Sequence, residues 1–106
     1  MGLFDGWKMP DIGQGVEEFR ATPGAVLLDV RSRQEFQKGH IPGSRNVPLS
    51  SLGEAAGLAE DKETPLFVYC YSGARSGQAV QVLRRMGYAN VKNIGGIAAW
   101  TGEVEC

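Results

Sequence analysis

The chain has 106 residues, 42% of which are hydrophobic, and this suits one compact domain with a modest core. Its 11 Lys and Arg residues nearly balance its 12 Asp and Glu residues, so no broad charge field predicts binding to nucleic acid or to an anionic membrane. Residues 1–11 lack the basic start and the apolar run of an export signal, and no stretch approaches the ~20 apolar residues that span a bilayer. We therefore expect a cytoplasmic protein with no nucleic-acid and no membrane partner.

The cysteine and histidine content limits the disulfide and metal chemistry. Two cysteines, Cys70 and Cys106, and one histidine are too few for a disulfide framework or a typical structural zinc site. We therefore expect free thiols, no metal and no organic cofactor. A disulfide between the two cysteines stays open, because a residue at the chain terminus is free to swing.

Strands and helices are predicted to alternate along the chain. In chain order we expect a helix over 16–21, a strand over 25–30, a helix over 32–38, a turn over 40–43, a strand over 45–49, a helix over 52–60, a strand over 66–69, a helix over 76–86, a strand over 90–94, a glycine turn at 95–96 and a helical turn over 97–100. This alternation indicates an α/β fold with a central, mostly parallel sheet and helices on both faces. Residues 1–106 are expected to form a single domain.

Three segments give the clearest local signals. Residues 25–30 form an apolar run typical of a strand buried in a parallel sheet. Ser32 is placed to cap the following helix, with Glu35 three residues later as its capping-box partner. Over residues 76–86, apolar side chains recur at i, i+3, i+4 and i+7, which is the spacing of an amphipathic helix.

The segment from Cys70 to Ser76 joins a buried strand to a helix. Ligands in parallel sheets gather beyond the carboxyl ends of the strands, which is where this segment begins. Successive backbone N–H groups in such a loop can form an anion cradle, and the N-terminus of the helix adds partial positive charge. Such surroundings favour the thiolate and lower cysteine pKa values from ~8.5 into the range ~3.5–7.5. We therefore predict that Cys70 is nucleophilic at neutral pH.

The residues of this loop are the predicted substrate-binding residues: Tyr71, Ser72, Gly73, Ala74, Arg75 and Ser76. Gly73 gives the loop the freedom to curl, where another residue would risk a strain of ~1–2 kcal/mol. Arg75 is a permanent cation with two open roles. It can bind an oxyanion of the substrate, or it can brace the loop against a carboxylate such as Asp29 or Glu35.

Three separated motifs resemble those of the rhodanese-like domains. The N-terminal signature of that family is similar to Leu28-Asp29-Val30-Arg31, Glu35-Phe36, residues 39–44 and Asn46-Val47-Pro48; its active-site loop is similar to residues 70–76, and its C-terminal signature to residues 95–100. The motifs occur in the expected order within a core of about residues 12–103.

The resemblance implies a reaction as well as an α/β fold. In this family the loop cysteine takes the outer sulfur of a donor such as thiosulfate, becomes a persulfide and passes the sulfur to cyanide or to a thiol. For this chain it implies a thiosulfate-type sulfurtransferase with Cys70 as the catalytic nucleophile, a small sulfur-containing anion or a protein persulfide as donor, and a thiol or cyanide as acceptor. Four residues, Asp29, Arg31, Glu35 and His40, are expected to support the loop rather than to react.

The length of the loop argues against phosphoryl chemistry. Related phosphatases resemble this fold but have one more residue between Cys and Arg, whereas four residues separate Cys70 from Arg75. The shorter loop makes a narrower cradle, and it offers no carboxylate in or just after the loop to protonate a leaving alkoxide. A phosphatase or an arsenate reductase is therefore less favoured.

The sequence leaves the sulfur donor and the role of each thiol open. A sulfur-carrier or binding module, loaded with persulfide by a partner protein, would carry the same loop. Thiosulfate-handling loops of the family have additional cations, whereas Arg75 is the only charged residue of this loop, so thiosulfate is expected to be a poor or surrogate donor. Cys70 could also be an ordinary buried core cysteine. A further hypothesis is that Cys106 attacks a persulfide at Cys70, which releases sulfide and leaves a disulfide. A thioredoxin-like protein would then be needed as a partner to reduce that disulfide.

Overall fold

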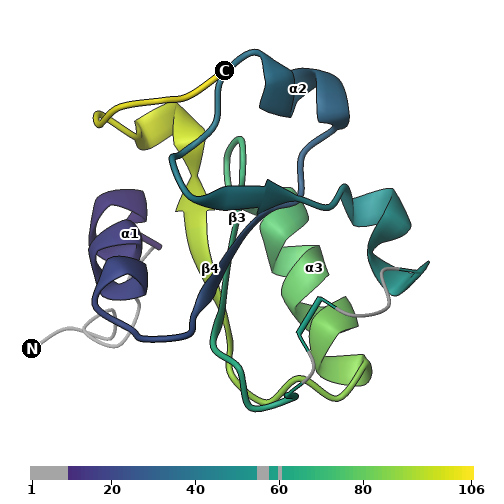
Figure 1. Ribbon diagram of the computed structural model, residues 1–106. Coiled ribbons are helices and arrows are strands. Elements are labelled where there is room, and N and C mark those ends of the chain that lie inside the picture. The colour runs from purple at the N-terminus through teal and green to yellow at the C-terminus, as the bar shows by residue number, and fades with distance from the viewer. Residues whose placement is uncertain (1–9, 55–57, 60) are drawn as a thin grey trace, which may run out of the picture.

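A computed structural model describes residues 10–54, 58, 59 and 61–106 (Figure 1). Within these residues the four strands are β1 Val26–Asp29, β2 Ser44–Asn46, β3 Leu66–Cys70 and β4 Val91–Gly96. They form one sheet in the order β2-β1-β3-β4, and every neighbouring pair is parallel. The predicted α/β fold with a parallel sheet is confirmed, and the two strongest apolar segments of the sequence form the two central strands.

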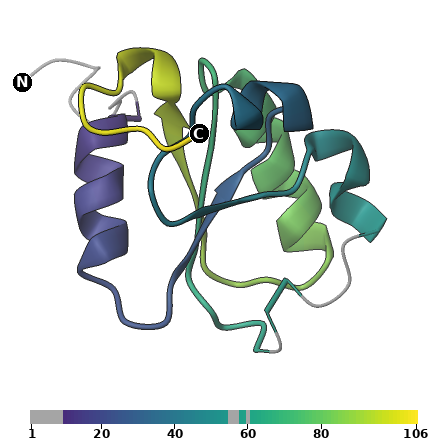
Figure 2. The ribbon, with the colours of Figure 1, turned by 45° about the horizontal axis from the view of Figure 1, so that its top comes forward.

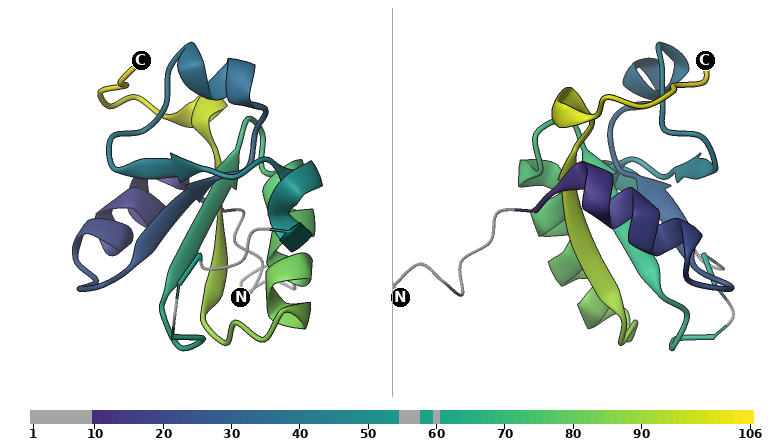
Figure 3. Two further views of the ribbon diagram at one scale, coloured as in Figure 1. Left: turned by 45° about the vertical axis from the view of Figure 1, so that its right-hand side comes forward. Right: turned by 90° about the vertical axis from the view of Figure 1, so that its left-hand side faces the viewer.

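Helices cover both faces of the sheet, as Figure 3 shows. The helical elements of the described residues are α1 Ile12–Arg20, α2 Arg33–Gln37, α3 Ala74–Arg85 and two short 3₁₀ helices, η1 Leu49–Glu54 and η2 Ile97–Ala99. On one face, Ile12 and Val16 of α1 share a core cluster with Leu27 of β1. On the other face, Leu83 of α3 shares a cluster with Leu28 of β1. Successive residues of β1 therefore face opposite sides, as the period of two along a strand requires.

The carboxyl ends of the strands share one edge of the sheet, because the described strands are all parallel. Figure 2 shows that α2, η2 and the C-terminal segment gather at this edge. His40 and Glu105 form an antiparallel bridge, in which each backbone N–H donates to the other residue's carbonyl oxygen at 2.8 Å. This bridge ties the C-terminal segment to the turn that follows α2.

Side-chain caps set where α1 and α2 begin. The capping box predicted for α2 is confirmed, since Ser32 Oγ accepts the Glu35 N–H at 3.2 Å and Glu35 Oε1 accepts the Ser32 N–H at 3.1 Å. The helix predicted over 16–21 begins earlier, at Ile12. Asp11 explains the difference, because its carboxylate accepts the N–H groups of residues 13 and 14 at 3.0 and 3.3 Å.

The region after β2 differs from its prediction. The strand predicted over 45–49 ends at Asn46, because Pro48 has no N–H to donate and η1 begins at the next residue. The helix predicted over 52–60 is wrong, since the 3₁₀ helix ends at Glu54 and residues 58 and 59 are not helical. Gly53 costs roughly 1 kcal/mol relative to alanine in an α-helix, which disfavours such a helix here.

Two segments that carry predictions lie outside the described residues. Residues 55–57 and 60 belong to the predicted helix over 52–60, and residues 1–9 belong to the segment 1–11, for which the sequence predicts no export signal. Among the residues that the structure describes, no helix is both long enough and apolar enough to cross a membrane.

The glycine pair predicted as a turn is instead part of β4. Gly95 pairs with Tyr69, and Gly96 pairs with Cys70, after a register irregularity at the Val68/Tyr69 step. Gly95 has a φ of +104°, a conformation that side chains other than glycine rarely adopt. At Gly96, an added Cβ would collide with the carbonyl group of Tyr71. The two glycines therefore let β4 run close beside the loop instead of turning away from it.

Candidate active site

Cys70 is the last residue of β3, and its side chain lies at the carboxyl edge of the sheet. The residue is only 1% exposed. Gly73, the N-cap of α3, has a φ of +102°, and its N–H donates to Cys70 Sγ at 2.9 Å. The freedom predicted for Gly73 is therefore used: the left-handed conformation accompanies a direct hydrogen bond from the loop to the sulfur.

The pKa of the Cys70 thiol reflects two opposing effects. Burial raises the pKa, because it disfavours the charged thiolate. The hydroxyl of Ser76 and the backbone N–H groups of Ser76, Gly73 and Ser72 donate toward the sulfur, and together they lower the pKa. The net effect is a pKa below the ordinary value of a cysteine thiol. The sequence-based prediction of a stabilised thiolate thus agrees with the donors that surround the sulfur.

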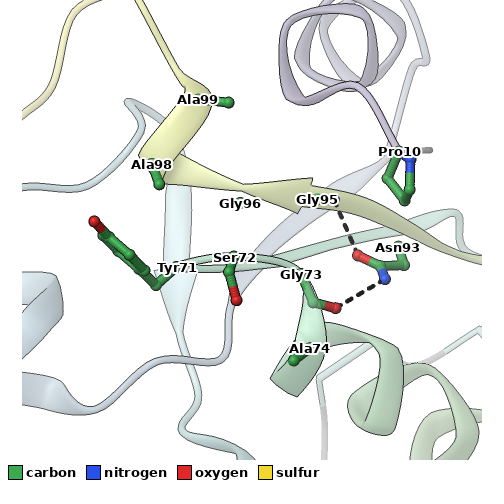
Figure 4. A pocket seen from close by; sticks show the side chains of 10 residues that line it. All are labelled: Pro10, Tyr71, Ser72, Gly73, Ala74, Asn93, Gly95, Gly96, Ala98 and Ala99. Atoms are coloured by element: carbon green, nitrogen blue, oxygen red, sulfur yellow. Dashed lines mark hydrogen bonds between the residues drawn. The ribbon is translucent and has the colours of Figure 1, made fainter.

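Asn93 of β4 is hydrogen-bonded to Gly73, as Figure 4 shows, and Ser76 also contacts Asn93. Ser76 Oγ lies 2.7 Å from Asn93 Oδ1, 3.0 Å from Gly73 O and 3.4 Å from Cys70 Sγ. The single hydroxyl proton serves one acceptor at a time, so it reaches the sulfur only when the hydroxyl rotates away from Asn93. Asn93 Nδ2 donates to Gly73 O at 3.1 Å, and Asn93 Oδ1 accepts the Gly95 N–H at 3.0 Å.

Asn93 is a site residue that was not predicted from the sequence. Its side chain holds the carbonyl of Gly73, so it fixes the peptide next to the one whose N–H points at the sulfur. A sequence signal is present, because a polar amide stands in the predicted strand and directly precedes Ile94 and the glycine pair. Polar residues in such strands need a specific partner, since burial without one costs free energy.

Arg75 is paired with Glu35 of α2. Its Nη1 and Nη2 atoms donate to the two carboxylate oxygens at 2.7 and 3.0 Å, which is a bidentate pair between partly exposed side chains. The hydrogen bond from Arg75, aided by those from Ser32 and opposed by partial burial, lowers the pKa of Glu35 to about 2. Of the two roles open to Arg75, this geometry is the bracing one, with Glu35 rather than Asp29 as the partner.

Asp29 and Arg31 form a buried pair at the C-terminal end of β1. Their side chains are 0% and 6% exposed, and Arg31 Nη2 donates to Asp29 Oδ2 at 2.7 Å. The same nitrogen donates to Gly39 O at 2.8 Å, and the Arg31 backbone N–H donates to Asp29 Oδ1 at 2.9 Å. The Asp29 carboxylate is therefore already bound by Arg31. This explains why Arg75 pairs with Glu35 of α2 instead.

His40 contacts α2 and the C-terminal segment. Its ring stacks on that of Phe36 with a centroid distance of 3.6 Å, and its Nδ1 lies 2.9 Å from Phe36 O. Its Nε2 lies 3.9 Å from Glu105 Oε2. His40 therefore contacts α2 near the end of that helix, whereas Glu35 belongs to the capping box at its start. The predicted supporting role of His40 would thus act on Glu35 through α2.

A pocket of about 540 Å³ opens between the loop and the segment formed by β4 and η2. Figure 4 shows the residues that line it, which are Tyr71, Ser72, Gly73 and Ala74 on one side, Gly95, Gly96, Ala98 and Ala99 on the other, and also Pro10 and Asn93. Tyr71 stands at this pocket and is 55% exposed. Among the described residues, no three His, Cys, Asp or Glu side chains gather as a set of metal ligands. The reactive group that the site offers is the buried, hydrogen-bonded sulfur of Cys70, whose pKa is lowered.

We expect the alkylation rate of Cys70 to depend on pH with a midpoint below that of an ordinary cysteine thiol, because the pKa of Cys70 is lowered. Only the thiolate reacts, so a lowered pKa means that the rate reaches half of its maximum at a lower pH than for an ordinary thiol. The measurement is the rate of reaction with iodoacetamide against pH, in a Cys106→Ser background so that a single thiol reports. Ser76→Ala removes one donor and is expected to raise the midpoint. A midpoint at or above that of the same Cys106→Ser protein unfolded in denaturant would contradict the assigned hydrogen bonds.

Residues 14–103 match the model of the Rhodanese-like domain family. The chain is 44% identical over 92 residues to the uncharacterized protein YqhL of Bacillus subtilis, a match that covers 84% of this chain and 71% of the relative. It is 41% identical over 71 residues to the thiosulfate sulfurtransferase PspE of Escherichia coli, which covers 66% of this chain and 68% of the relative.

Solved structures agree with the sequence matches. The human single-domain sulfurtransferase TSTD1 superposes with a TM-score of 0.73 and 30% identity, over 88% of this chain and 96% of that one. Two longer relatives are matched only in part: the chain spans 43% of one named a putative sulfur carrier protein and 23% of one named an adenylyltransferase and sulfurtransferase.

Proposed function

The chain belongs to the family of rhodanese-like domains, and we propose that it is a sulfurtransferase that carries sulfur as a persulfide on Cys70. The observation that carries this proposal is the environment of the Cys70 sulfur. It sits at the end of a central strand, accepts the Gly73 N–H at 2.9 Å and has a lowered pKa. A thiolate held by fixed donors is both a nucleophile and a good site for the anionic persulfide that follows.

The proposed reaction has two displacement steps. In the first, the Cys70 thiolate attacks the outer sulfur of thiosulfate, a bond forms between the two sulfurs, and sulfite leaves with the electron pair of the broken S–S bond. In the second, an acceptor such as cyanide or a thiolate attacks the outer sulfur of the persulfide. The bond to Cys70 Sγ then breaks, and the sulfur of Cys70 leaves as the thiolate. No external oxidant or reductant is consumed in either step.

The loop supports this reaction better than phosphate ester cleavage. Four residues separate Cys70 from Arg75, and the arginine fork that would hold phosphate oxygens is occupied by Glu35. A persulfide needs stabilisation for one terminal sulfur, which a few N–H donors can supply. The cytoplasm suits this chemistry, because thiols stay reduced there and both cysteines of this chain are free.

A second candidate function is that of a sulfur carrier that partner proteins load. The pairing of Arg75 with Glu35 favours it, because the only charged side chain of the loop is largely neutralised before a dianion such as thiosulfate arrives. A protein persulfide donor brings less negative charge to the thiolate. The two candidates share the Cys70 persulfide and differ in the donor that forms it.

The test is a comparison of sulfur donors in steady-state turnover, with cyanide as acceptor and thiocyanate as the measured product. Saturable turnover with thiosulfate supports the first candidate, a sulfurtransferase that uses small-molecule donors. Turnover with a persulfide donor but not with thiosulfate supports the carrier. Thiocyanate formation from neither donor would contradict both candidates.

We expect Glu35→Gln to improve the use of thiosulfate by lowering its KM about twofold to fivefold. The substitution removes the carboxylate that neutralises Arg75 while keeping the size of the side chain, so one more positive charge faces the incoming dianion. The measurement is KM for thiosulfate at low and high salt, since the gain should shrink as salt screens it. A matched control is Glu18→Gln, at the ion pair with Lys92, which lies on α1 and β4 and should leave KM unchanged. A raised KM in Glu35→Gln would mean that thiosulfate binding depends on Arg75 held in its paired position.

A further inference from the structure

A second pocket, which shares no lining residue with the one shown in Figure 4, opens between α2 and η1. Its volume is about 490 Å³. We call it the arginine pocket and define it by five of its lining residues, Val30, Arg33, Ser50, Ser51 and Arg75. Figure 1 shows α2 and η1 as separate short coils, and the N-terminal end of α3 lies near both. The pocket is therefore bounded by three elements that come from different parts of the chain.

The arginine pocket lies beside the candidate active site. Val30, one of its lining residues, donates its backbone N–H to Tyr69 O at 3.0 Å and belongs to the same core cluster as Cys70. Arg75, another lining residue, lies in the first turn of α3, directly after the loop. The pKa of its guanidinium is raised mainly by Glu35, against the effect of burial, and further by the negative charge of the Cys70 thiolate. Arg75 thus connects this pocket to the segment that carries Cys70.

The charges of the arginine pocket favour binding of an anionic group. Arg75 is balanced by Glu35, whereas Arg33 is exposed and forms no ion pair or hydrogen bond within the described residues. The pocket therefore presents about one net positive charge, beside the hydroxyl groups of Ser50 and Ser51. A guanidinium fork matches the two oxygens of a carboxylate, and hydroxyl groups are further donors to the same oxygens.

We infer that the arginine pocket binds the carboxylate of an organic thiol while that thiol accepts sulfur from Cys70, with Arg33 as the residue that sets this preference. The inference rests on the proposed function, because it concerns the acceptor of the Cys70 persulfide. In the step, the acceptor thiolate forms a bond to the outer sulfur and the bond from that sulfur to Cys70 Sγ breaks. The electron pair of the broken bond stays on Cys70, and the product is an organic persulfide that carries a carboxylate.

The test measures the unloading of a preformed Cys70 persulfide in a single turnover. The probes are ω-mercaptocarboxylates of increasing chain length, each compared with the ω-mercaptoalcohol of the same length. Arg33→Gln is expected to lower the second-order rate constant for the carboxylates by about threefold and to leave the alcohols unchanged. Because each thiol is compared between protein variants, the intrinsic nucleophilicity of the thiols cancels. The difference should vanish near 1 M salt, where the screening length is about 3 Å.

Two controls separate this effect from general charge and from damage to the site. Arg85→Gln removes an exposed arginine at the far end of α3 and is expected to change neither class of thiol. Alkylation of unloaded Cys70 by neutral iodoacetamide should proceed at the same rate in Arg33→Gln as in the parent protein. Equal losses for carboxylates and alcohols, equal effects of Arg33→Gln and Arg85→Gln, or no effect at all would each overturn the inference. If no donor can load Cys70 with sulfur, both the proposed function and this inference are wrong. If the alcohols unload the persulfide normally, the proposed function stands, and the carboxylates then test the arginine pocket alone.

Discussion

Cys70→Ser is expected to abolish sulfur transfer, with a loss of about 10³-fold or more in turnover with any donor. Serine keeps the shape of the side chain and the hydrogen bond from Gly73, so the loop should stay folded. A hydroxyl group of ordinary pKa is not an effective nucleophile toward sulfur, and it cannot form a persulfide. The measurement is thiocyanate formation from thiosulfate, and from a persulfide donor, under conditions that saturate the parent protein.

Cys106→Ser is the matched control for this prediction. Cys106 is exposed, and its Sγ lies 3.7 Å from Lys38 O, at the C-terminal end of α2. If it has no part in transfer, its replacement should leave turnover unchanged with every acceptor. A Cys70→Ser protein that keeps a tenth or more of the parent activity would rule out a covalent role for Cys70. If Cys106→Ser instead lost turnover with thiol acceptors only, this would support a role for Cys106 in resolving the Cys70 persulfide.

Asp29→Ala is expected to destabilise the protein by about 3–5 kcal/mol. The substitution leaves the guanidinium of Arg31 buried without its counter-charge, and a buried unpaired charge is far more costly than the loss of an exposed pair. For a domain of this size, each 1 kcal/mol corresponds to a fall in Tm of roughly 4–8 °C. The measurement is the free energy of unfolding from denaturant titration, with Tm as a second readout.

Two further variants decide whether the cost of Asp29→Ala comes from the stranded charge. Glu18→Ala breaks the exposed pair with Lys92, whose side chains are 47% and 55% exposed, and should cost less than about 1 kcal/mol. The double variant Asp29→Ala/Arg31→Met removes both charges and should be more stable than Asp29→Ala alone. If Asp29→Ala lowered the free energy of unfolding no more than Glu18→Ala, the buried Asp29–Arg31 pair would have no special role in stability.

The loop and its nucleophile can be predicted because several local signals coincide there. The apolar run before Cys70 requires a buried strand, and the helical stripe after Ser76 requires a packed helix, so the residues between them form a strand-to-helix loop. The parallel sheet follows from the same alternation. The sequence therefore predicts where the Cys70 thiol lies. Only the structure identifies the Gly73 N–H as a hydrogen-bond donor to its sulfur.

The partner of Arg75 cannot be predicted from the sequence, because it depends on a competition between distant residues. Asp29 and Glu35 are equally plausible carboxylates when only the sequence is considered. The choice follows from Arg31, whose backbone and side chain both bind Asp29 and leave Glu35 available at the start of α2. Such an outcome requires the three-dimensional positions of β1, α2 and α3 together.

Asn93 and the glycine pair escape local prediction for a related reason. An Asn in a strand and two following glycines are typical of a strand that stops at a turn. In the structure the strand continues through Gly95 and Gly96, because the register irregularity of β4 against β3 brings them beside the loop. The Asn93 side chain then binds Gly73, twenty residues earlier in the chain. Contacts of this range are not visible in local sequence patterns.

Intact-protein mass spectrometry, after the protein is mixed with thiosulfate or with a persulfide donor, decides whether Cys70 carries sulfur. We expect a gain of one sulfur atom, about 32 Da, that is present in the Cys106→Ser protein, absent in Cys70→Ser and lost on addition of cyanide. An adduct that persists in Cys70→Ser, or no adduct from either donor in the parent protein, would contradict a sulfurtransferase that acts through a Cys70 persulfide.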